Sequence, residues 1–295
     1  MPSYESITRT MPGAVDFEIE KALGKPPTSV GPLSGGSVAE VYRAVVPEIG
    51  DVVVKVDRSK GPALEIEGYM LEYLAAHSTL PVPKVFHAAP ELLIMEMLPG
   101  GSHFSSNAQI HAAELLAELH GIRAERFGLE RDTLIGSLHQ PNTFEDSWAE
   151  FFCEHRLLHM AREAHGARRI GKKLLRRIEA FAAGLEERLE QPEYPSLLHG
   201  DVWTTNVLAE DNHITGFIDP AVYFGHPEIE LAFITLFSTF GTAFFDRYNE
   251  VRPISAGFFE ERRDIYNLYP LLVHVRLFGG GYVASVEGTL EKFGY

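Results

Sequence analysis

One stretch of the chain combines the residue types that phosphoryl transfer requires. An apolar approach leads into His199-Gly200-Asp201, an amide follows at Asn206, and a second carboxylate follows at Asp219. The Asp201 carboxylate can orient and deprotonate an attacking hydroxyl, while the Asn206 oxygen and the Asp219 carboxylate are ligand types that hold Mg²⁺ against ATP phosphates. This spacing predicts Asp201 as the catalytic base and Asn206 and Asp219 as magnesium ligands.

A lysine and a glutamate further upstream form a second predicted pair. Period-two alternation in the run Val52–Val56 places Lys55 inside an otherwise apolar strand, and Glu67 interrupts the leucine stripe of a helix from Leu64 to Leu74. A carboxylate on a buried face needs a cation, so Lys55 is the expected partner of Glu67. In kinases such a pair positions the α and β phosphates of ATP. The alternatives are a lysine that snorkels from an edge strand and a partly exposed glutamate.

The segment Gly35-Gly36-Ser37 separates two short β-branched runs, Val30–Leu33 and Val41–Val46. Together with Val52–Val56 these runs predict a three-stranded antiparallel meander. A glycine pair lets backbone N–H groups approach a ligand closely, so we expect this segment to contact the phosphates of ATP. The alternative is a plain hairpin turn.

A connection between two lobes is predicted where a strand runs into glycines. The apolar run Leu92–Leu98 ends at Pro99-Gly100-Gly101, which is typical of a domain connection. Backbone groups of Glu96, Met97 and Leu98 can pair with an adenine edge at such a hinge, although a plain strand end fits as well. We therefore expect a nucleotide-binding lobe over residues 1–98, a hinge at about 96–101, and a catalytic and substrate-binding lobe over 102–295.

The pattern becomes helical beyond this connection. Apolar stripes predict helices around 110–117, 144–158 and 174–189, a short hairpin is expected at 207–218, and apolar helices follow from Glu228. A further short helix is expected at Val15–Leu23. The predicted fold class is α+β and two-lobed: a small N-terminal lobe with an antiparallel sheet plus helix, and a larger, mainly helical C-terminal lobe.

Composition narrows the range of partners. The 295 residues carry 26 Lys plus Arg against 41 Asp plus Glu, a formal charge of −15, which disfavours nucleic acid and anionic membranes. The single Cys153 excludes an internal disulfide and suits a reducing cytoplasm. The segment Met1–Met11 has no apolar core typical of a secretory signal, and charges and glycines break the run Leu268–Ala284, so no membrane span is expected.

Two other kinds of chemistry are weakly indicated. His155, His159 and His165 recur along one predicted helix and can ligate a metal, but no glutamate follows His155 as a zinc-protease helix requires. The chain also has no Gly-x-Ser-x-Gly sequence, so a serine nucleophile elbow is not expected.

The motifs resemble those of the fructosamine (ketosamine) kinases, relatives of aminoglycoside and choline kinases with a protein-kinase-like fold. The likeness spans nearly the whole chain and rests on 196–203, 218–226, Gly136-Ser137, Gln140-Pro141-Asn142, 266–269 and 277–280. The resemblance implies ATP and Mg²⁺ as cofactors, phosphorylation of the sugar 3-hydroxyl of a ketosamine, and release of the amine when the product falls apart. The acceptor is then a small-molecule ketosamine or a glycated protein, and the activity repairs early glycation.

The same resemblance implies roles for individual residues. Asp201 accepts the proton, Lys55 and Glu67 position phosphates, and the three residues of the hinge bind adenine. His199, Trp203 and Tyr223 are candidate substrate contacts, and Trp203 is either a wall for the sugar ring or part of the core. Alternatives are a kinase for another hydroxyl acceptor, such as an aminoglycoside or sugar, and a non-catalytic pseudokinase scaffold.

Three positions depart from the family pattern. Ser37 stands where many members carry a cysteine, so a regulatory disulfide in that loop cannot form. Thr205 occupies a position that is often glycine, and Glu230 one that is usually aspartate. Glu230 is still expected to brace the catalytic loop.

Overall fold

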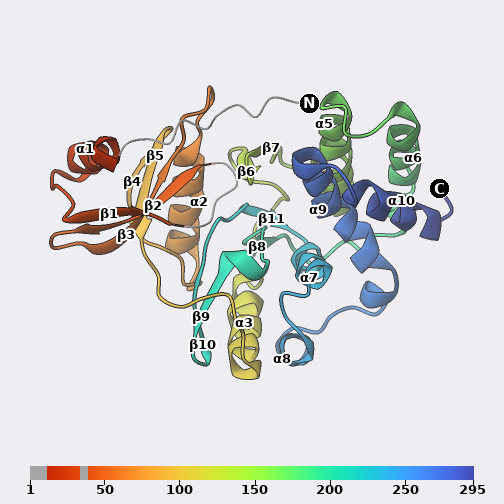
Figure 1. The fold of residues 1–295 in the computed structure, drawn as a ribbon. Helices are drawn as coiled ribbons and strands as arrows, with labels where there is room; N and C mark the ends of the chain where they lie inside the picture. The colour runs from red at the N-terminus through yellow and green to blue at the C-terminus, as the bar shows by residue number, and fades with distance from the viewer. Residues whose placement is uncertain (1–11, 34–38) are drawn as a thin grey trace. The chain divides into compact units, whose positions relative to one another are not determined.

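The structure is a computed structural model that describes residues 12–33 and 39–295 (Figure 1). Its contacts divide the chain into unit 1, Met1–Glu72 with Pro83–Leu98, and unit 2, Tyr73–Val82 with Pro99–Tyr295. Residues 73–82, expected in the N-terminal lobe, thus group with unit 2, where the Phe217 N–H donates to the Pro81 carbonyl at 2.8 Å. The division into functional lobes at residue 98 stays a prediction.

Unit 1 is built on an antiparallel sheet with strand order β1-β2-β3-β5-β4. Its elements are α1 (Pro12–Leu23), β1 (Ser29–Pro32), β2 (Glu40–Val46), β3 (Gly50–Val56), the first part of α2 (Leu64–His77), β4 (Val85–Ala89) and β5 (Leu92–Glu96). The predicted meander is present as β1, β2 and β3, and β5 extends it because it pairs with β3. The predicted glycine segment Gly35-Gly36-Ser37 lies outside the described residues.

The two faces of this sheet carry different kinds of side chain. Side chains at alternate strand positions, among them Val52, Val54 and Ile94, pack with α1 in an apolar core. The opposite face carries Lys55, whose cross-strand partner is Leu93, and it faces α2. The period-two pattern of β3 therefore places a charged side chain on the α2 side without breaking the core.

Unit 2 is mainly helical. Its helices are α3 (Ser106–Leu119), α4 (Trp148–Phe152), α5 (His159–Gly166), α6 (Lys172–Ala182), α7 (Pro227–Leu236), α8 (Thr242–Val251), α9 (Arg263–Phe278) and α10 (Tyr282–Lys292). Its short strands are β6 (Thr133–Ile135), β7 (Leu138–Gln140), β8 (Ser196–Leu198), β9 (Val207–Glu210), β10 (His213–Phe217) and β11 (Tyr223–Gly225). These strands form three antiparallel pairs, β6 with β7, β8 with β11 and β9 with β10.

Two predicted helices are interrupted. The stripe over 144–158 begins as α4 and continues as the π-helix Cys153–Leu158, and the stripe over 174–189 ends as α6 at Ala182 before the 3-10 turn Leu185–Glu187. Gly184, with its high helix cost, separates those last two elements. Within the described ranges, no helix has both the length and the apolar character that crossing a bilayer requires.

A buried ion pair ties α7 to the start of α9. The Arg262 guanidinium donates both to Glu228 Oε1 and to Glu228 Oε2 at 2.7 Å, and both side chains are almost fully buried. Arg262 also donates to Glu190 and to backbone carbonyls of the preceding loop. Such a pair contributes little net stability, but removing one partner leaves a buried charge uncompensated.

Arg262→Met should therefore lower the free energy of unfolding by about 3–5 kcal/mol, because the Glu228 carboxylate stays buried without its cation. The neighbouring Arg263→Met is the matched control, since the pair of Arg263 with Asp264 is partly exposed and should be worth about 1 kcal/mol or less. Urea unfolding at pH 7 measures both. Equal losses in the two variants would contradict this account.

Candidate active site

The turn that carries Asp201 follows β8 and requires a glycine. Gly200 has φ +87°, and a Cβ at this position would lie 2.1 Å from the Ala221 carbonyl oxygen. The Ala221 N–H in turn donates to the His199 carbonyl at 2.7 Å. The turn is thus pressed against the chain just before β11, and only glycine fits.

Asp201, Asn206 and Asp219 lie together in unit 2. Asn206 Nδ2 donates to Asp201 Oδ2 at 2.8 Å and to the backbone carbonyls of Asp201 and Asp219 at 3.1 and 3.5 Å. Asp219 adopts the left-handed φ of 52° directly after β10. The Asn206 amide NH₂ makes these contacts, and its Oδ1 accepts from the Thr205 hydroxyl at 3.3 Å.

The surroundings of Asp201 favour its neutral form. Burial raises the pKa of Asp201 well above its ordinary value, the charge of Asp219 raises it further, and the hydrogen bond from Asn206 partly opposes the shift. A cation close to both carboxylates would offset their repulsion. The oxygen donors of Asn206 and Asp219 suit Mg²⁺, which binds through one or two carboxylates plus water and substrate phosphates. Among the described residues, no group of three or more His, Cys, Asp and Glu is placed so that it could hold a metal ion.

Glu230 on α7 accepts hydrogen bonds from the turn that carries Asp201, here called the catalytic turn. Its Oε1 accepts from the Gly200 N–H at 2.5 Å, and its Oε2 accepts from the His199 N–H at 3.4 Å. The start of α7 is fixed by His226, whose Nδ1 accepts from the Glu228 N–H, and by Pro227 in the first turn. The glutamate thus makes the bracing contact that the sequence analysis expected.

A histidine and a tyrosine form a hydrogen-bonded chain that ends at the Glu230 carboxylate. His120 Nε2 lies 2.8 Å from Glu230 Oε2, and His120 Nδ1 lies 2.7 Å from the Tyr248 hydroxyl. Burial lowers the pKa of His120, so the ring is neutral; because a carboxylate only accepts, Nε2 carries the proton and Tyr248 donates to Nδ1. Burial alone would raise the pKa of Glu230, but His120, His199 and the Gly200 N–H outweigh it and the pKa is lowered.

Sequence reasoning missed His120 and Tyr248. His120 lies 110 residues from Glu230 and 128 residues from Tyr248 in the chain, so no local spacing connects it with either of them. A polar residue at the end of an apolar helix was the only signal that His120 offered.

The predicted pair of Lys55 and Glu67 is present in unit 1. Lys55 Nζ lies 2.7 Å from Glu67 Oε1, and the two side chains are 12% and 15% exposed. This partial burial fixes the position of the ammonium group while leaving it within reach of solvent.

The hinge residues differ in what their backbone offers. The Met97 N–H already donates to the Asp51 carbonyl at 3.2 Å, and the Glu96 N–H donates to the Lys84 carbonyl at 2.8 Å. The Glu96 side chain is exposed and accepts from the Lys84 N–H. An adenine contact through the Met97 or Glu96 N–H therefore does not fit; the Glu96 carbonyl and the Leu98 N–H are the remaining candidates.

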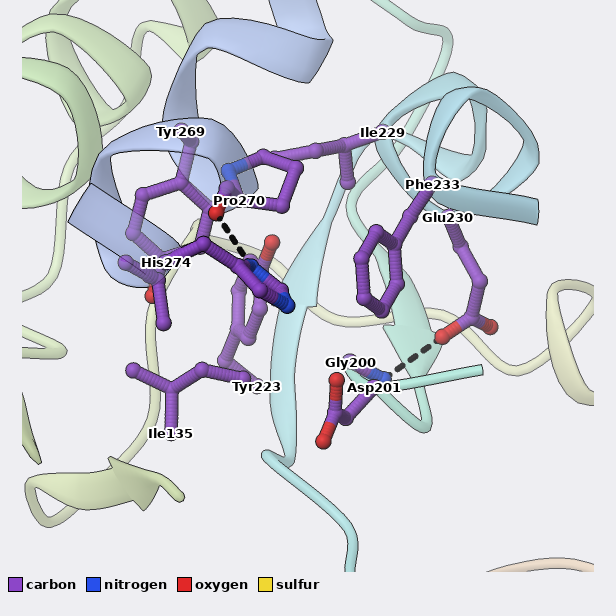
Figure 2. Close-up of a pocket in the computed structure, with 11 residues that line it drawn as sticks. Ile135, Gly200, Asp201, Tyr223, Ile229, Glu230, Phe233, Tyr269, Pro270 and His274 are labelled. Carbon is purple, nitrogen blue, oxygen red and sulfur yellow. Dashed lines mark hydrogen bonds between the residues drawn. The ribbon is translucent and has the colours of Figure 1, made fainter. Parts of the chain in front are cut away.

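A pocket opens in unit 2 with Asp201 at its wall (Figure 2). Its volume is about 400 Å³ when the space open to solvent is included. The polar side is formed by Gly200, Asp201 and Glu230. The remaining wall is apolar and aromatic, with Ile135, Tyr223, Ile229, Phe233, Tyr269 and His274. An acceptor bound here would meet Asp201 while the rest of it lies on apolar surface.

The three candidate substrate contacts have different surroundings. His199 is fully buried beneath the turn, where its Nδ1 accepts from the Asp201 N–H, so direct contact with a substrate does not fit this structure. Tyr223 lines the pocket, and the Arg156 guanidinium carbon lies 3.9 Å from the centroid of its ring. Trp203 is half-buried and packs against Phe237.

The three histidines considered as metal ligands bind different partners. His155 pairs with Glu145, His159 contacts the His139 carbonyl, and His165 contacts the Ile170 carbonyl. Their ring nitrogens do not converge.

The fold and the site define a phosphotransferase of the protein-kinase-like class. A structure from Thermobifida fusca described as a "putative fructosamine-3-kinase" is 31% identical, covers 94% of this chain and 97% of its own, and superposes with a TM-score of 0.83. The aminoglycoside phosphotransferase APH(4)-Ia, at 16% identity, shares the fold with a TM-score of 0.66 over 95% of this chain and 99% of its own.

The sequence comparisons place the chain more closely. The family model "Fructosamine kinase" matches residues 11–293. The protein-ribulosamine 3-kinase of Arabidopsis thaliana is 35% identical over 280 residues, which cover 90% of this chain and 82% of the plant protein. The chain belongs to the fructosamine kinase family, and it is a phosphotransferase with a hydroxyl acceptor.

Glu230→Gln should lower kcat about 10- to 100-fold with little change in the KM for ATP. The substitution removes a charged acceptor from two backbone N–H groups and sets an amide NH₂ against His120, and hydrogen bonds to charged groups are worth about 1.5–3 kcal/mol. Steady-state kinetics measures this, with the exposed Glu118→Gln as the control. An unchanged kcat would disprove the bracing role.

Glu230→Gln should also change how the free energy of unfolding depends on pH. Because the folded-state pKa of Glu230 lies below its ordinary value of 4.5, its stabilising effect is full above about that pH and is lost as the pH falls through the folded-state pKa. The difference in unfolding free energy between wild type and Glu230→Gln should therefore shrink toward acidic pH.

Proposed function

We propose that this protein transfers the γ-phosphoryl group of ATP to the sugar 3-hydroxyl of ketosamines, fructosamine or ribulosamine adducts that are free or attached to protein. The observation that carries the proposal is the hydrogen-bonded group of Asp201, Asn206 and Asp219 in unit 2, of which Asp201 lines the pocket. Membership of the fructosamine kinase family supports the acceptor class. Release of the amine from the unstable product makes the activity one of deglycation repair.

Asp201 is the proposed proton acceptor. The hydroxyl oxygen of the sugar attacks the γ-phosphorus, its proton passes to an Asp201 carboxylate oxygen, and ADP leaves. Asn206 Nδ2 donates a hydrogen bond to Asp201 Oδ2 at 2.8 Å, which limits rotation of that carboxylate. The Asn206 oxygen and the Asp219 carboxylate would hold Mg²⁺, which would neutralise phosphate charge there. The turn itself stays fixed because Glu230 accepts from the Gly200 N–H.

Unit 1 supplies the proposed nucleotide contacts. Lys55, kept in place by Glu67, binds the α and β phosphates, and its position in a regular strand limits its movement. The Glu96 carbonyl and the Leu98 N–H pair with adenine. The segment Gly35-Gly36-Ser37 is proposed to cover the phosphates, and a serine at its last position leaves no thiol for a disulfide switch.

The pocket suits a sugar with an organic substituent. Tyr223, which lines the pocket, offers aromatic surface for sugar C–H groups, and the acidic residues near Asp201 favour an acceptor that carries a positive amine over one that carries phosphate. A cytoplasmic location remains the expectation set by the single cysteine. A kinase for another hydroxyl acceptor is the second candidate, because the fold is shared with an aminoglycoside phosphotransferase.

The decisive experiment compares acceptors directly. ATP consumption is measured with fructosyl-lysine, ribulosyl-lysine, glycated albumin and a panel of aminoglycosides, with magnesium present. We expect turnover with the ketosamines and a kcat/KM at least a hundredfold lower with the aminoglycosides. Preference for an aminoglycoside would favour the second candidate, and ATP binding without any turnover would indicate a pseudokinase.

Asp201→Asn should lower kcat by about 10²–10⁴-fold, because the amide cannot accept the hydroxyl proton in the transition state. ATP affinity measured by calorimetry should stay within about threefold, since phosphate and adenine contacts are made elsewhere. Asp211→Asn, at an exposed turn with φ 53°, is the matched control and should behave as wild type. A variant that retains a tenth or more of the wild-type kcat would remove Asp201 from the mechanism.

A further inference from the structure

Five aromatic side chains form a continuous cluster, here called the aromatic ridge, which consists of Trp203, Phe237, His274, Phe278 and Tyr282. The imidazole of His274 is its centre, with ring centroids 4.9 Å from Phe237, 4.9 Å from Tyr282, 5.7 Å from Phe278 and 6.4 Å from Trp203. Phe278 and Tyr282 are themselves 6.5 Å apart. The ridge joins the segment after Asp201 to α9 and α10.

His274 connects the ridge to the pocket. It lines the same pocket as Asp201, and Figure 2 shows its ring projecting from α9 into that space. Its Nδ1 lies 2.8 Å from the Pro270 carbonyl oxygen, which only accepts, so Nδ1 carries the proton. Burial lowers the pKa of His274, so the ring is neutral at pH 7 and behaves as an aromatic surface. The pocket wall and the ridge therefore form one apolar surface.

The outer end of the ridge is open to solvent. Phe278 is 56% exposed at the last position of α9, and Gly279 and Gly280 follow it with φ +65° and +64°. Tyr282 begins α10 on the other side of this glycine turn and is half-buried. A large aromatic side chain at a fixed helix end, continuous with a binding pocket, is a typical contact surface for a ligand.

The covalent structure of a ketosamine determines which part of the acceptor reaches this surface. In a ketosamine two carbon atoms separate C3, which bears the reacting hydroxyl, from the amine nitrogen. When that hydroxyl lies at Asp201, the sugar occupies the pocket and the substituent on nitrogen must lead out of it. For a glycated lysine this substituent begins with four methylene groups, an apolar stem that needs an apolar surface.

We propose that the aromatic ridge binds the carbon substituent on the amine of the acceptor, and that Phe278 and Tyr282 determine specificity for that part. The inference rests on the proposed function and adds to it the preferred amine class: amines with an unbranched apolar stem, as in lysine adducts. Small amines leave the ridge uncovered, and a substituent with a carboxylate close to the nitrogen places an anion against the negative faces of the aromatic rings.

The test uses a series of 1-alkylamino-1-deoxyfructoses with methyl, propyl and pentyl chains. For the wild type, kcat/KM should rise by about two- to fourfold per added methylene, the upper limit being full burial of each group. In Phe278→Ala the total gain from methyl to pentyl should fall at least fivefold, and Phe278→Tyr should restore it. Phe259→Ala, which truncates another exposed phenylalanine, is the matched control and should keep the wild-type gain.

Binding is followed independently of turnover through tryptophan fluorescence, to which Trp203 of the ridge contributes together with the buried Trp148. Pentyl affinity should drop in Phe278→Ala by the same factor as kcat/KM. A wild type that does not distinguish methyl from pentyl, or a Phe278→Ala variant with the wild-type gain, would overturn the assignment of the ridge. Failure of the wild type to phosphorylate any of the alkylamines would overturn the proposed function and the ridge with it.

Discussion

The buried carboxylate of Glu230 is the constraint on which the candidate site depends. A charge without exposure to water is costly unless it is paired and hydrogen-bonded. Here the compensation comes from the Gly200 and His199 N–H groups and from His120, which is itself held by Tyr248. These partners belong to α3, α8 and the catalytic turn, so satisfying one anion fixes how three parts of unit 2 meet.

The same rule of paired charges operates in the other places where function is proposed. Lys55 and Glu67 compensate each other on the α2 side of the sheet in unit 1, while the opposite face is an uninterrupted apolar core. Separate faces allow a charged pair to be positioned rigidly without weakening the packing that holds the strands. Arg262 and Glu228 form another compensated charge pair, at the junction of α7 with the segment before α9. Positioning, rather than net stability, is what such pairs contribute.

The sequence predicted those features whose residues are close in the chain or follow a regular period. The strands β2 and β3, the pair of Lys55 and Glu67, and the group formed by Asp201, Asn206 and Asp219 are of this kind. Features made by distant residues were not predictable: the support of Glu230 and the pocket wall from α7 and α9 depend on tertiary packing. The interruptions of the predicted helices and the use of the Met97 N–H by Asp51 depend on neighbouring elements in the same way.

The carboxyl groups of Asp201 and Glu230 line one pocket, and their surroundings shift their pKa values in opposite directions. Glu230 is surrounded by donors, which lower its pKa and keep it an acceptor for backbone N–H groups. Asp201 is held by burial and by the charge of Asp219 in surroundings that raise its pKa, and the Asn206 amide is the one donor that opposes this shift. A group whose charged form is destabilised gains most from taking up a proton, whereas a group whose charged form is stabilised serves best as a fixed anchor. These surroundings support the proposed division, in which Asp201 accepts the proton and Glu230 fixes the turn, although both carboxyl groups line the same pocket.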